Sequence, residues 1–193
     1  MKGKSLSIVI GVIILIVIGV IILLAIPFIG SYNSLSTLDE NVDAAWAQVE
    51  NQLKRRADLI PNLLETVKGY ASHEKEVIDS IAAARSMYTN ARTPQEYAVA
   101  DEGLTNAVKS LNIIVENYPD LKANQNFQDF QVELSGTENR ISTERMRYND
   151  LVRTYNTKIR RFPTNVMAKI LGFDKRQYFE INEQDTEVPK VNF

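Results

Sequence analysis

The 193-residue sequence contains no cysteine, which removes several kinds of chemistry at once. Disulfide bonds, thiolate zinc sites and cysteine nucleophiles are all excluded. Only one histidine is present, His73, so a histidine-rich metal site is excluded as well. His73 and Glu74 begin like the zinc-protease motif, but the residue four positions after His73 is Val77 instead of a second histidine. We therefore expect no bound metal.

Other catalytic and binding patterns are also missing. The sequence has no glycine-rich phosphate loop, and it has no Glu-x-x-His pair of the kind that helical di-iron proteins use. The formal net charge is −2 and the pI is near 5.6, so no overall positive field favours nucleic acid. These absences predict a protein that is not an enzyme, takes no cofactor and binds no nucleic acid.

The sequence does contain a long apolar run, from Leu6 to Ile29, without a charged residue. As a helix this run would rise about 36 Å, enough to cross a hydrocarbon core of about 30 Å. A cleaved signal peptide would have a shorter apolar region followed by a small-x-small site, and Leu24–Pro27 is a poor site of that type. We therefore predict that residues 1–30 are an uncleaved membrane anchor, with the transmembrane helix at about 6–29.

The charges on either side of this run indicate its orientation. Lys2 and Lys4 precede it, and the first charged residues after it are Asp39 and Glu40. Positive residues favour the cytoplasmic side, so we expect a single-pass protein of the cell membrane with a cytoplasmic N-terminus and an extracytoplasmic helical domain. The opposite orientation stays open, because a basic segment later in the chain would also suit a cytoplasmic leaflet.

The rest of the chain predicts helices, because its apolar residues recur at steps of three and four. Short links between them favour antiparallel neighbours. The predicted fold class is all-α: an N-terminal transmembrane helix, then an antiparallel up-and-down four-helix bundle with a short C-terminal helix. The bundle occupies residues 31–180, and the polar residues 181–193 are predicted to be a flexible tail. The predicted helices run from about 34 to 70, 72 to 90, 94 to a stop at Pro119, 126 to 160 and 164 to 171.

Two local signals refine these helices. Thr93, Pro94 and Glu96 form the pattern of a capping box, with an N-cap hydroxyl, a proline at the first helical position and a glutamate at N3. Pro61 lies inside the first predicted bundle helix, where it removes one backbone donor and crowds the preceding turn. We expect a kink near Ala57–Pro61.

Three charged residues fall on helix faces that are otherwise apolar: Arg56, Glu138 and Arg145. An unpaired charge in such a place would be costly. We therefore expect Glu138 to meet Arg56, Arg145 or both, between the first and fourth bundle helices. We interpret the three as a buried structural cluster that fixes the register of the helices. An active-site acid at Glu138 is the alternative interpretation.

A basic segment with interleaved aromatic residues begins at the end of the fourth bundle helix. In an up-and-down bundle behind a membrane helix, this end returns towards the bilayer, and basic charge beside aromatic rings suits a headgroup interface. We hypothesise that the segment contacts lipid, with an ordinary solvated face as the alternative. Its basic residues are Lys158, Arg160, Arg161, Lys169, Lys175 and Arg176.

Several strings of residues together carry a family pattern. They are Trp46, Leu53–Leu63, Val67–Glu74, Tyr118–Asn124, Thr137–Ile141, the doublets Tyr148-Asn149 and Tyr155-Asn156, Phe162-Pro163 and Gly172-Phe173. With them the chain resembles the LemA family of single-pass membrane proteins, from about residue 32 to residue 179. The resemblance implies a bromodomain-like, up-and-down four-helix bundle behind one transmembrane helix. It implies no molecular activity, since members have been associated only broadly with bacterial envelopes, with signalling or stress, and in one branch with organelle membranes.

The leading hypothesis is a membrane-tethered interaction or scaffold protein of the LemA type. Its partners would be the lipid bilayer and an unidentified protein, and self-association into a homo-oligomer is a further option. The partner would bind exposed helix faces or the loop after the third helix, in particular Tyr118, Pro119, Asp120 and Asn124. A rigid turn is the plainer interpretation of that loop. The alternative function is a ligand-sensing or regulatory subunit of a membrane signalling or envelope-stress system, with a dry apolar pocket near Pro61.

Overall fold

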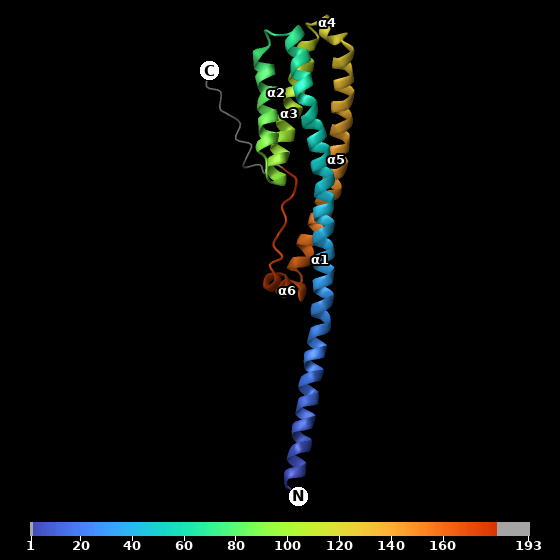
Figure 1. Cartoon of the computed structure of the whole chain (residues 1–193), viewed down its shortest axis with the longest axis vertical. Helices are drawn as coiled ribbons and strands as arrows, with labels where there is room; N and C mark the ends of the chain where they lie inside the picture. Colours follow the sequence, from blue (N-terminus) through green and yellow to red (C-terminus); the bar gives the residue numbers. More distant parts are fainter. Residues whose placement is uncertain (1, 181–193) are drawn as a thin grey trace. The chain divides into compact units, whose positions relative to one another are not determined.

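The computed structural model describes residues 2–180, without the side chains of residues 2–10, 12 and 20–27. All regular elements of residues 2–180 are helices and none is a strand, which confirms the predicted all-α class (Figure 1). The tail predicted at 181–193 lies outside the described residues. The helices are α1 (Lys2–Tyr70), α2 (Lys75–Asn90), α3 (Pro94–Val115), α4 (Pro119–Lys122), α5 (Gln125–Arg160) and α6 (Thr164–Leu171).

α1 is one continuous helix where the sequence predicted two, the membrane anchor and the first bundle helix. The residues left between those two predictions, 30–33, are helical. They include no proline, and extending a formed helix by one residue needs no new nucleation, so the helix continues across Gly30. α1 also includes Pro61. The kink expected there stays a prediction.

Among the residues that the structure describes, no helix has an apolar stretch long enough to cross a membrane. The anchor predicted at Leu6–Ile29 falls largely on residues whose side chains lie outside that description. The anchor and its orientation therefore stay predictions.

The chain divides into two compact units. Unit 1 consists of Met1–Asn41 and Arg153–Arg176, and unit 2 consists of Val42–Val152 and Gln177–Phe193. Each unit combines segments that are far apart in the sequence. The division therefore does not coincide with the boundary predicted at residue 30, which was drawn from hydropathy alone.

In unit 2, α2 and α3 lie beside the parts of α1 and α5 that belong to this unit (Figure 1). An ion pair of 2.9 Å joins Arg55 of α1 to Glu133 of α5. Gln131 of α5 donates a hydrogen bond of 2.6 Å to Asn112 of α3. These polar contacts thus link α5 to α1 and to α3.

The core of unit 2 is built largely from the predicted apolar faces. In α5, Phe127, Leu134, Ile141 and Tyr148 are buried at intervals of seven residues, which keeps them on one side of the helix. Burial of one such side chain contributes about 1.5–3 kcal/mol. The buried apolar residues of α1 in this unit are Val42, Ala45, Val49, Leu53, Ile60, Leu63, Leu64 and Val67.

The turn between α2 and α3 has the predicted capping box. Thr93 Oγ1 accepts from the backbone N–H of Glu96 at 3.2 Å, and Glu96 Oε2 accepts from the backbone N–H of Thr93 at 3.1 Å. Pro94 follows Thr93 in the first turn, where the missing N–H costs nothing. This prediction is confirmed, and α2 and α3 pack against each other on either side of the turn.

Two details of the predicted helices are wrong. α2 begins at Lys75 instead of about residue 72, and Glu74 at its N-cap makes no side-chain cap hydrogen bond. The loop predicted after the third helix contains the short helix α4, because Pro119 already has the backbone angle that the first helical position requires.

Unit 1 combines the first part of α1 with the end of α5, with α6 and with the residues after it. Arg176 Nη2 lies 2.8 Å from Asp39 Oδ1 of α1. Asn156 of α5 brackets the backbone of Arg176, donating to its carbonyl and accepting from its N–H, both at 2.9 Å. α6 packs into this unit through Met167 and Ala168, which are buried.

Candidate functional site

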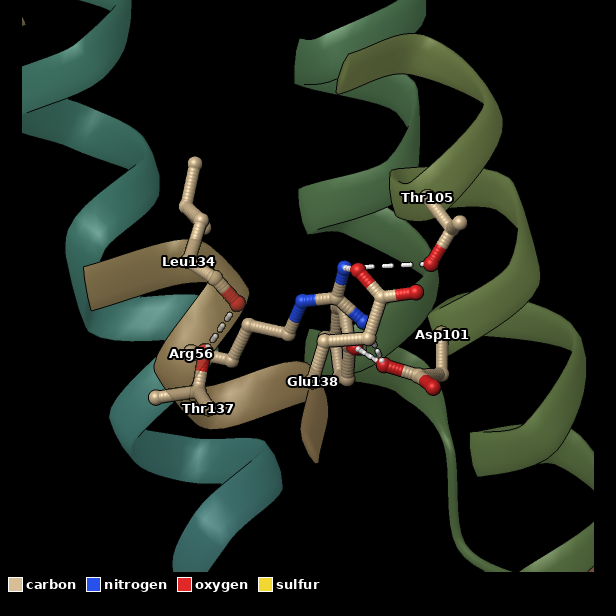
Figure 2. A network of polar contacts seen from close by, with 7 residues as sticks. Arg56, Asp101, Thr105, Leu134, Thr137 and Glu138 are labelled. Atoms are coloured by element: carbon tan, nitrogen blue, oxygen red, sulfur yellow. Dashed lines mark hydrogen bonds and ion pairs between the residues drawn. The ribbon is translucent and has the colours of Figure 1, made fainter. Parts of the chain in front are cut away.

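Arg56 is the centre of a polar network in unit 2 (Figure 2). Its place on the apolar face of α1 leaves the residue 1% exposed, so its guanidinium needs partners inside the protein. α3 supplies them: Arg56 Nη1 lies 2.5 Å from Asp101 Oδ1, and Nη2 donates to Thr105 Oγ1 at 3.0 Å. Asp101 and Thr105 are four residues apart, which places both on the same side of α3.

Tyr88 joins α2 to the same carboxylate. Its hydroxyl donates to Asp101 Oδ1 at 2.6 Å, so one oxygen receives both Arg56 and Tyr88. Burial raises the pKa of Tyr88 far above its ordinary value of 10.0, and the negative charge of Asp101 raises it further. The phenol is therefore protonated at neutral pH and acts as a donor. Through these contacts the network connects α1, α2 and α3.

Glu138 approaches the network from α5. Its Oε2 lies 3.5 Å from Arg56 Nη2, but its side chain is 54% exposed. Arg145 is exposed too, and no ion pair within residues 2–180 joins it to Glu138. The predicted contact between Glu138 and Arg56 is therefore confirmed. The predicted burial is wrong for Glu138 and Arg145, since only Arg56 of the three is buried.

On α5 the buried position is Thr137, the residue just before Glu138. Thr137 is fully buried, and its hydroxyl donates to the carbonyl of Leu134 at 2.9 Å (Figure 2). A step of three from Leu134 and a step of four both fit a helix of 3.6 residues per turn, so periodicity alone does not choose between them. A threonine hydroxyl that is already hydrogen-bonded is buried at lower cost than a carboxylate, which explains why Thr137 is buried and Glu138 is not.

Sequence reasoning missed Asp101 and Thr105 as partners of Arg56. A signal was present, because Asp101 follows Ala100 on the predicted apolar face of α3 and Thr105 lies four residues further on. Periodicity showed that Arg56 faces the core, but not which helix it faces. Among the described residues Arg56 Nε has no hydrogen-bond partner, so the guanidinium is held by its two terminal nitrogens.

A surface cavity of about 430 Å³ lies beside this network. Its wall includes Asp101 and Lys109 of α3 together with Glu138 and Arg145 of α5. Charges of both signs therefore border one cavity. Such a wall suits a small polar molecule that carries an acidic and a basic group.

A smaller cavity of about 160 Å³ borders Ala57, at the start of the predicted kink. Its wall contains the charged residues Glu50 and Lys54 as well as Tyr88 and Tyr97. This is not a dry apolar pocket, which is the kind that would have favoured the ligand-sensing alternative near Pro61. The cavity beside Asp101 is therefore the better candidate for a ligand.

The C-terminal segment that borders the larger cavity is tied to unit 2 by aromatic and amide groups. Trp46 of α1 contacts the rings of Tyr148 and Phe179, with centroids 5.3 and 6.1 Å away. Asn149 brackets Phe179, donating to its carbonyl at 3.2 Å and accepting from its N–H at 2.9 Å. The hydroxyl of Tyr148 donates to the carbonyl of Gln177 at 2.8 Å. The Tyr148-Asn149 doublet thus has a structural role.

The predicted partner-binding loop is held at both ends. The Tyr118 hydroxyl donates to Glu74 Oε1 at 2.7 Å, and Asn124 donates to a tyrosine hydroxyl at the end of α1 at 3.0 Å. The bond to the Glu74 carboxylate raises the pKa of Tyr118. Pro119 and Asp120 are exposed between these two ties. The geometry supports a rigid turn, and it leaves Pro119 and Asp120 as the residues that a partner would meet.

Most of the predicted lipid-proximal residues are exposed. Arg176 differs from them, because its guanidinium is paired with Asp39 and is only partly exposed. We therefore remove Arg176 from the predicted patch, since a cation that is already paired is less free to meet a headgroup. Lys158 is half-buried, and the exposed members are Arg160, Arg161, Lys169 and Lys175.

These features define a class of protein: an all-helical chain whose buried polar network is organised around one arginine. Within the part of the chain that the structure describes, no group of three or more histidine, aspartate or glutamate side chains is placed to hold a metal ion.

The chain belongs to the LemA family, whose model matches residues 45–193. It is similar to Protein LemA of Metamycoplasma hominis, with 27% identity over 157 residues that cover 81% of this chain and 72% of that protein. It is also similar to magnetosome protein MamQ 2 of Paramagnetospirillum magneticum (27% identity over 175 residues) and to magnetosome protein MamQ of Magnetospirillum gryphiswaldense (26% over 174). These two matches cover 77% of this chain and 64% of each MamQ protein, so the chain spans less than two thirds of their length.

Proposed function

We propose that this protein is a membrane-tethered interaction or scaffold protein of the LemA type. In this proposal the N-terminal part of α1 crosses the cell membrane, and α1, α2, α3 and α5 form an antiparallel up-and-down bundle in unit 2. The uncharged apolar run from Leu6 to Ile29 supports the anchor. The orientation that the flanking charges favour places the N-terminus in the cytoplasm.

The proposed interaction role is supported by two exposed apolar side chains of unit 2. Ile113 of α3 is 74% exposed and Val132 of α5 is 71% exposed. The 2.6 Å hydrogen bond between their sequence neighbours, Asn112 and Gln131, shows that these two helix segments are in contact. We infer that the two side chains belong to one exposed surface, because contiguous exposed apolar area is typical of surfaces that bind another protein.

The polar network supports a structural role for its acidic residues. Asp101 Oδ1 already accepts from Arg56 and from Tyr88, and Glu138 is ion-paired with Arg56. A carboxylate oxygen that already accepts from an arginine is less available to take a proton from a substrate. We therefore propose that the protein has no enzymatic activity.

Site-specific photo-crosslinking of the full chain in native membranes tests the interaction role. A photoreactive residue at Ile113 should give a stoichiometric protein adduct that mass spectrometry identifies. The same residue at Ser80, which is exposed on α2, is the matched control and should give none. If both positions give only lipid adducts or no adduct, the interaction role is wrong.

A ligand-sensing role is the second candidate, and the cavity of about 430 Å³ favours it. Lys109 and Arg145 would bind an acidic group there, and Glu138 would bind a basic one. Native mass spectrometry of the purified full chain should then show a bound small molecule that is lost from Arg145→Ala. Arg140→Ala, an exposed arginine on the same helix, should retain it.

A further inference from the structure

The outward side of α6 is apolar although it is exposed. α6 buries Met167 and Ala168, while Val166 and Ile170, one turn apart, are exposed. Ile170 is 66% exposed, and Phe162 just before the helix is 83% exposed. We call Phe162, Val166, Ile170 and Leu171 the outer face of α6. An exposed apolar face of this kind marks a contact surface.

The charged residues close in sequence to this face are mostly basic, and the first acidic residue after it is Asp174. Residues 151–173 contain five basic residues and no acidic one, in a chain whose formal net charge is −2. Arg160, Arg161 and Lys169 are exposed close to the outer face. An apolar face with a largely basic border suits a membrane surface, where apolar side chains reach the acyl chains and cations meet anionic headgroups.

The turn after α6 places this helix next to the residues that follow the apolar run of α1. Gly172 has a left-handed φ of 75°, which glycine adopts without strain, and the N–H of Phe173 donates to the Ala168 carbonyl at 2.9 Å. The Phe173 ring then meets the ring of Tyr32, with centroids 6.2 Å apart. Tyr32 lies three residues after Ile29, which is about 4.5 Å along a helix axis.

We propose that the outer face of α6 lies on the lipid bilayer at the point where α1 enters it, with Arg160, Arg161 and Lys169 against anionic headgroups. The inference rests on the proposed membrane anchor and adds a second contact with the membrane. The bilayer is favoured over a protein as the occupant for two reasons. The border of the face is largely basic, and the Phe173–Tyr32 contact places the chain after α6 beside the end of the apolar run.

A single labelled cysteine tests the proposal directly, because the natural chain has none. Ile170→Cys in the full chain is labelled with an environment-sensitive fluorophore and reconstituted into vesicles of phosphatidylcholine and phosphatidylglycerol. Lipids with a spin-labelled acyl chain serve as the quencher. Ile113→Cys, an equally exposed isoleucine on α3, is the matched control. Both replacements are at exposed positions, so the core is left intact.

The expected result is a blue-shifted emission at position 170 that the lipid quencher extinguishes, with neither effect at position 113. Neutralising Arg160, Arg161 and Lys169 to glutamine should reduce the quenching at position 170. Three outcomes overturn the proposal: a label at 170 that emits as in water, a blue shift that lipid does not quench, which means that protein covers the face, or equal quenching at both positions.

Flotation of the same vesicles separates this proposal from the anchor. If the full chain does not float with the vesicles, both the anchor and the α6 contact are wrong. If it floats while the label at Ile170 reports water, the anchor stands and only the α6 contact is wrong.

Discussion

Arg56 shows how one buried charge constrains its neighbours. Its guanidinium is matched by Asp101, which also receives the hydroxyl of Tyr88. In a low-dielectric interior an isolated charge is strongly unfavourable, so removing either charge leaves the other uncompensated. The three residues come from α1, α2 and α3, and the network therefore favours one alignment of these helices over others.

Replacing Asp101 by asparagine tests the importance of this pair. Asp101→Asn keeps the size of the side chain but removes the charge that balances Arg56. We expect the free energy of unfolding to fall by about 3 kcal/mol, the range for breaking a buried ion pair. Urea unfolding of the full chain in detergent, followed by circular dichroism, measures the change.

Two nearby acids serve as controls. Glu102→Gln, at an exposed position next to Asp101, should change stability by less than about 0.5 kcal/mol. Glu138→Gln should lower the free energy of unfolding by at most about 1 kcal/mol, because the Arg56–Glu138 pair is 3.5 Å long and its carboxylate faces solvent. Equal losses for all three variants would contradict the central place of Asp101.

The stability of the fold should also depend on pH through Tyr88. Its pKa is raised in the folded protein, whereas in the unfolded chain it is near the ordinary 10.0. Below about pH 10 the phenol is protonated in both states. Above that pH only the unfolded chain loses the proton, so the tyrosine contributes stability at lower pH that is lost as pH rises.

Tyr88→Phe removes this ionisation. The free energy of unfolding of the variant should therefore fall less steeply above about pH 10 than that of the natural chain. Urea titrations at a series of alkaline pH values measure both slopes. Parallel slopes would show that the Tyr88 phenol does not have a raised pKa in the folded protein.

Single helices in this protein are specified by short-range signals. The capping box at Thr93 and Glu96 was predicted from four consecutive residues and is present in the structure. The sequence placed Glu138 on the apolar face of α5, but in the structure Thr137 is buried there instead. A cap depends on neighbours in the chain, whereas the exact edge of a buried face depends on the helix packed against it.

The capping box gives a prediction at this scale. Thr93→Ala removes the hydroxyl that accepts from the Glu96 N–H, and it should reduce the free energy of unfolding by about 1 kcal/mol. Thr89→Ala is the control, because the Thr89 hydroxyl donates only to the Arg85 carbonyl within α2. Thermal unfolding of both variants should show the larger loss for Thr93. The reverse order would contradict the capping role.

At the scale of the whole molecule, two charge patterns favour opposite orientations. Lys2 and Lys4 before the apolar run favour a cytoplasmic N-terminus, whereas the basic stretch 151–173 would suit a cytoplasmic leaflet. The positive-inside rule counts charges close in sequence to the membrane segment, and the two lysines meet that condition. We therefore keep the extracytoplasmic placement of the helical domain as the prediction.

Labelling of Ser80→Cys, at an exposed position outside the proposed partner surface, tests this orientation in intact cells. A membrane-impermeant maleimide should modify the cysteine before lysis, and no other thiol in the chain competes. The same cells labelled after lysis give the total reactive protein. Labelling only after lysis would show that the helical domain lies in the cytoplasm. The basic residues beside α6 would then face the anionic cytoplasmic leaflet.

The sequence by itself determined the helical class, the family pattern, the capping box and most of the core. Each of these depends on periodicity or on residues adjacent in the chain, as the burial of Val42, Val49 and Leu53 illustrates. Only the tertiary structure decided that Arg56 pairs with Asp101, 45 residues away, and that Asn149 brackets Phe179. Periodicity specifies which side of a helix is buried, but the choice of partner depends on how separate helices are aligned, and that alignment is reached only when the whole core packs.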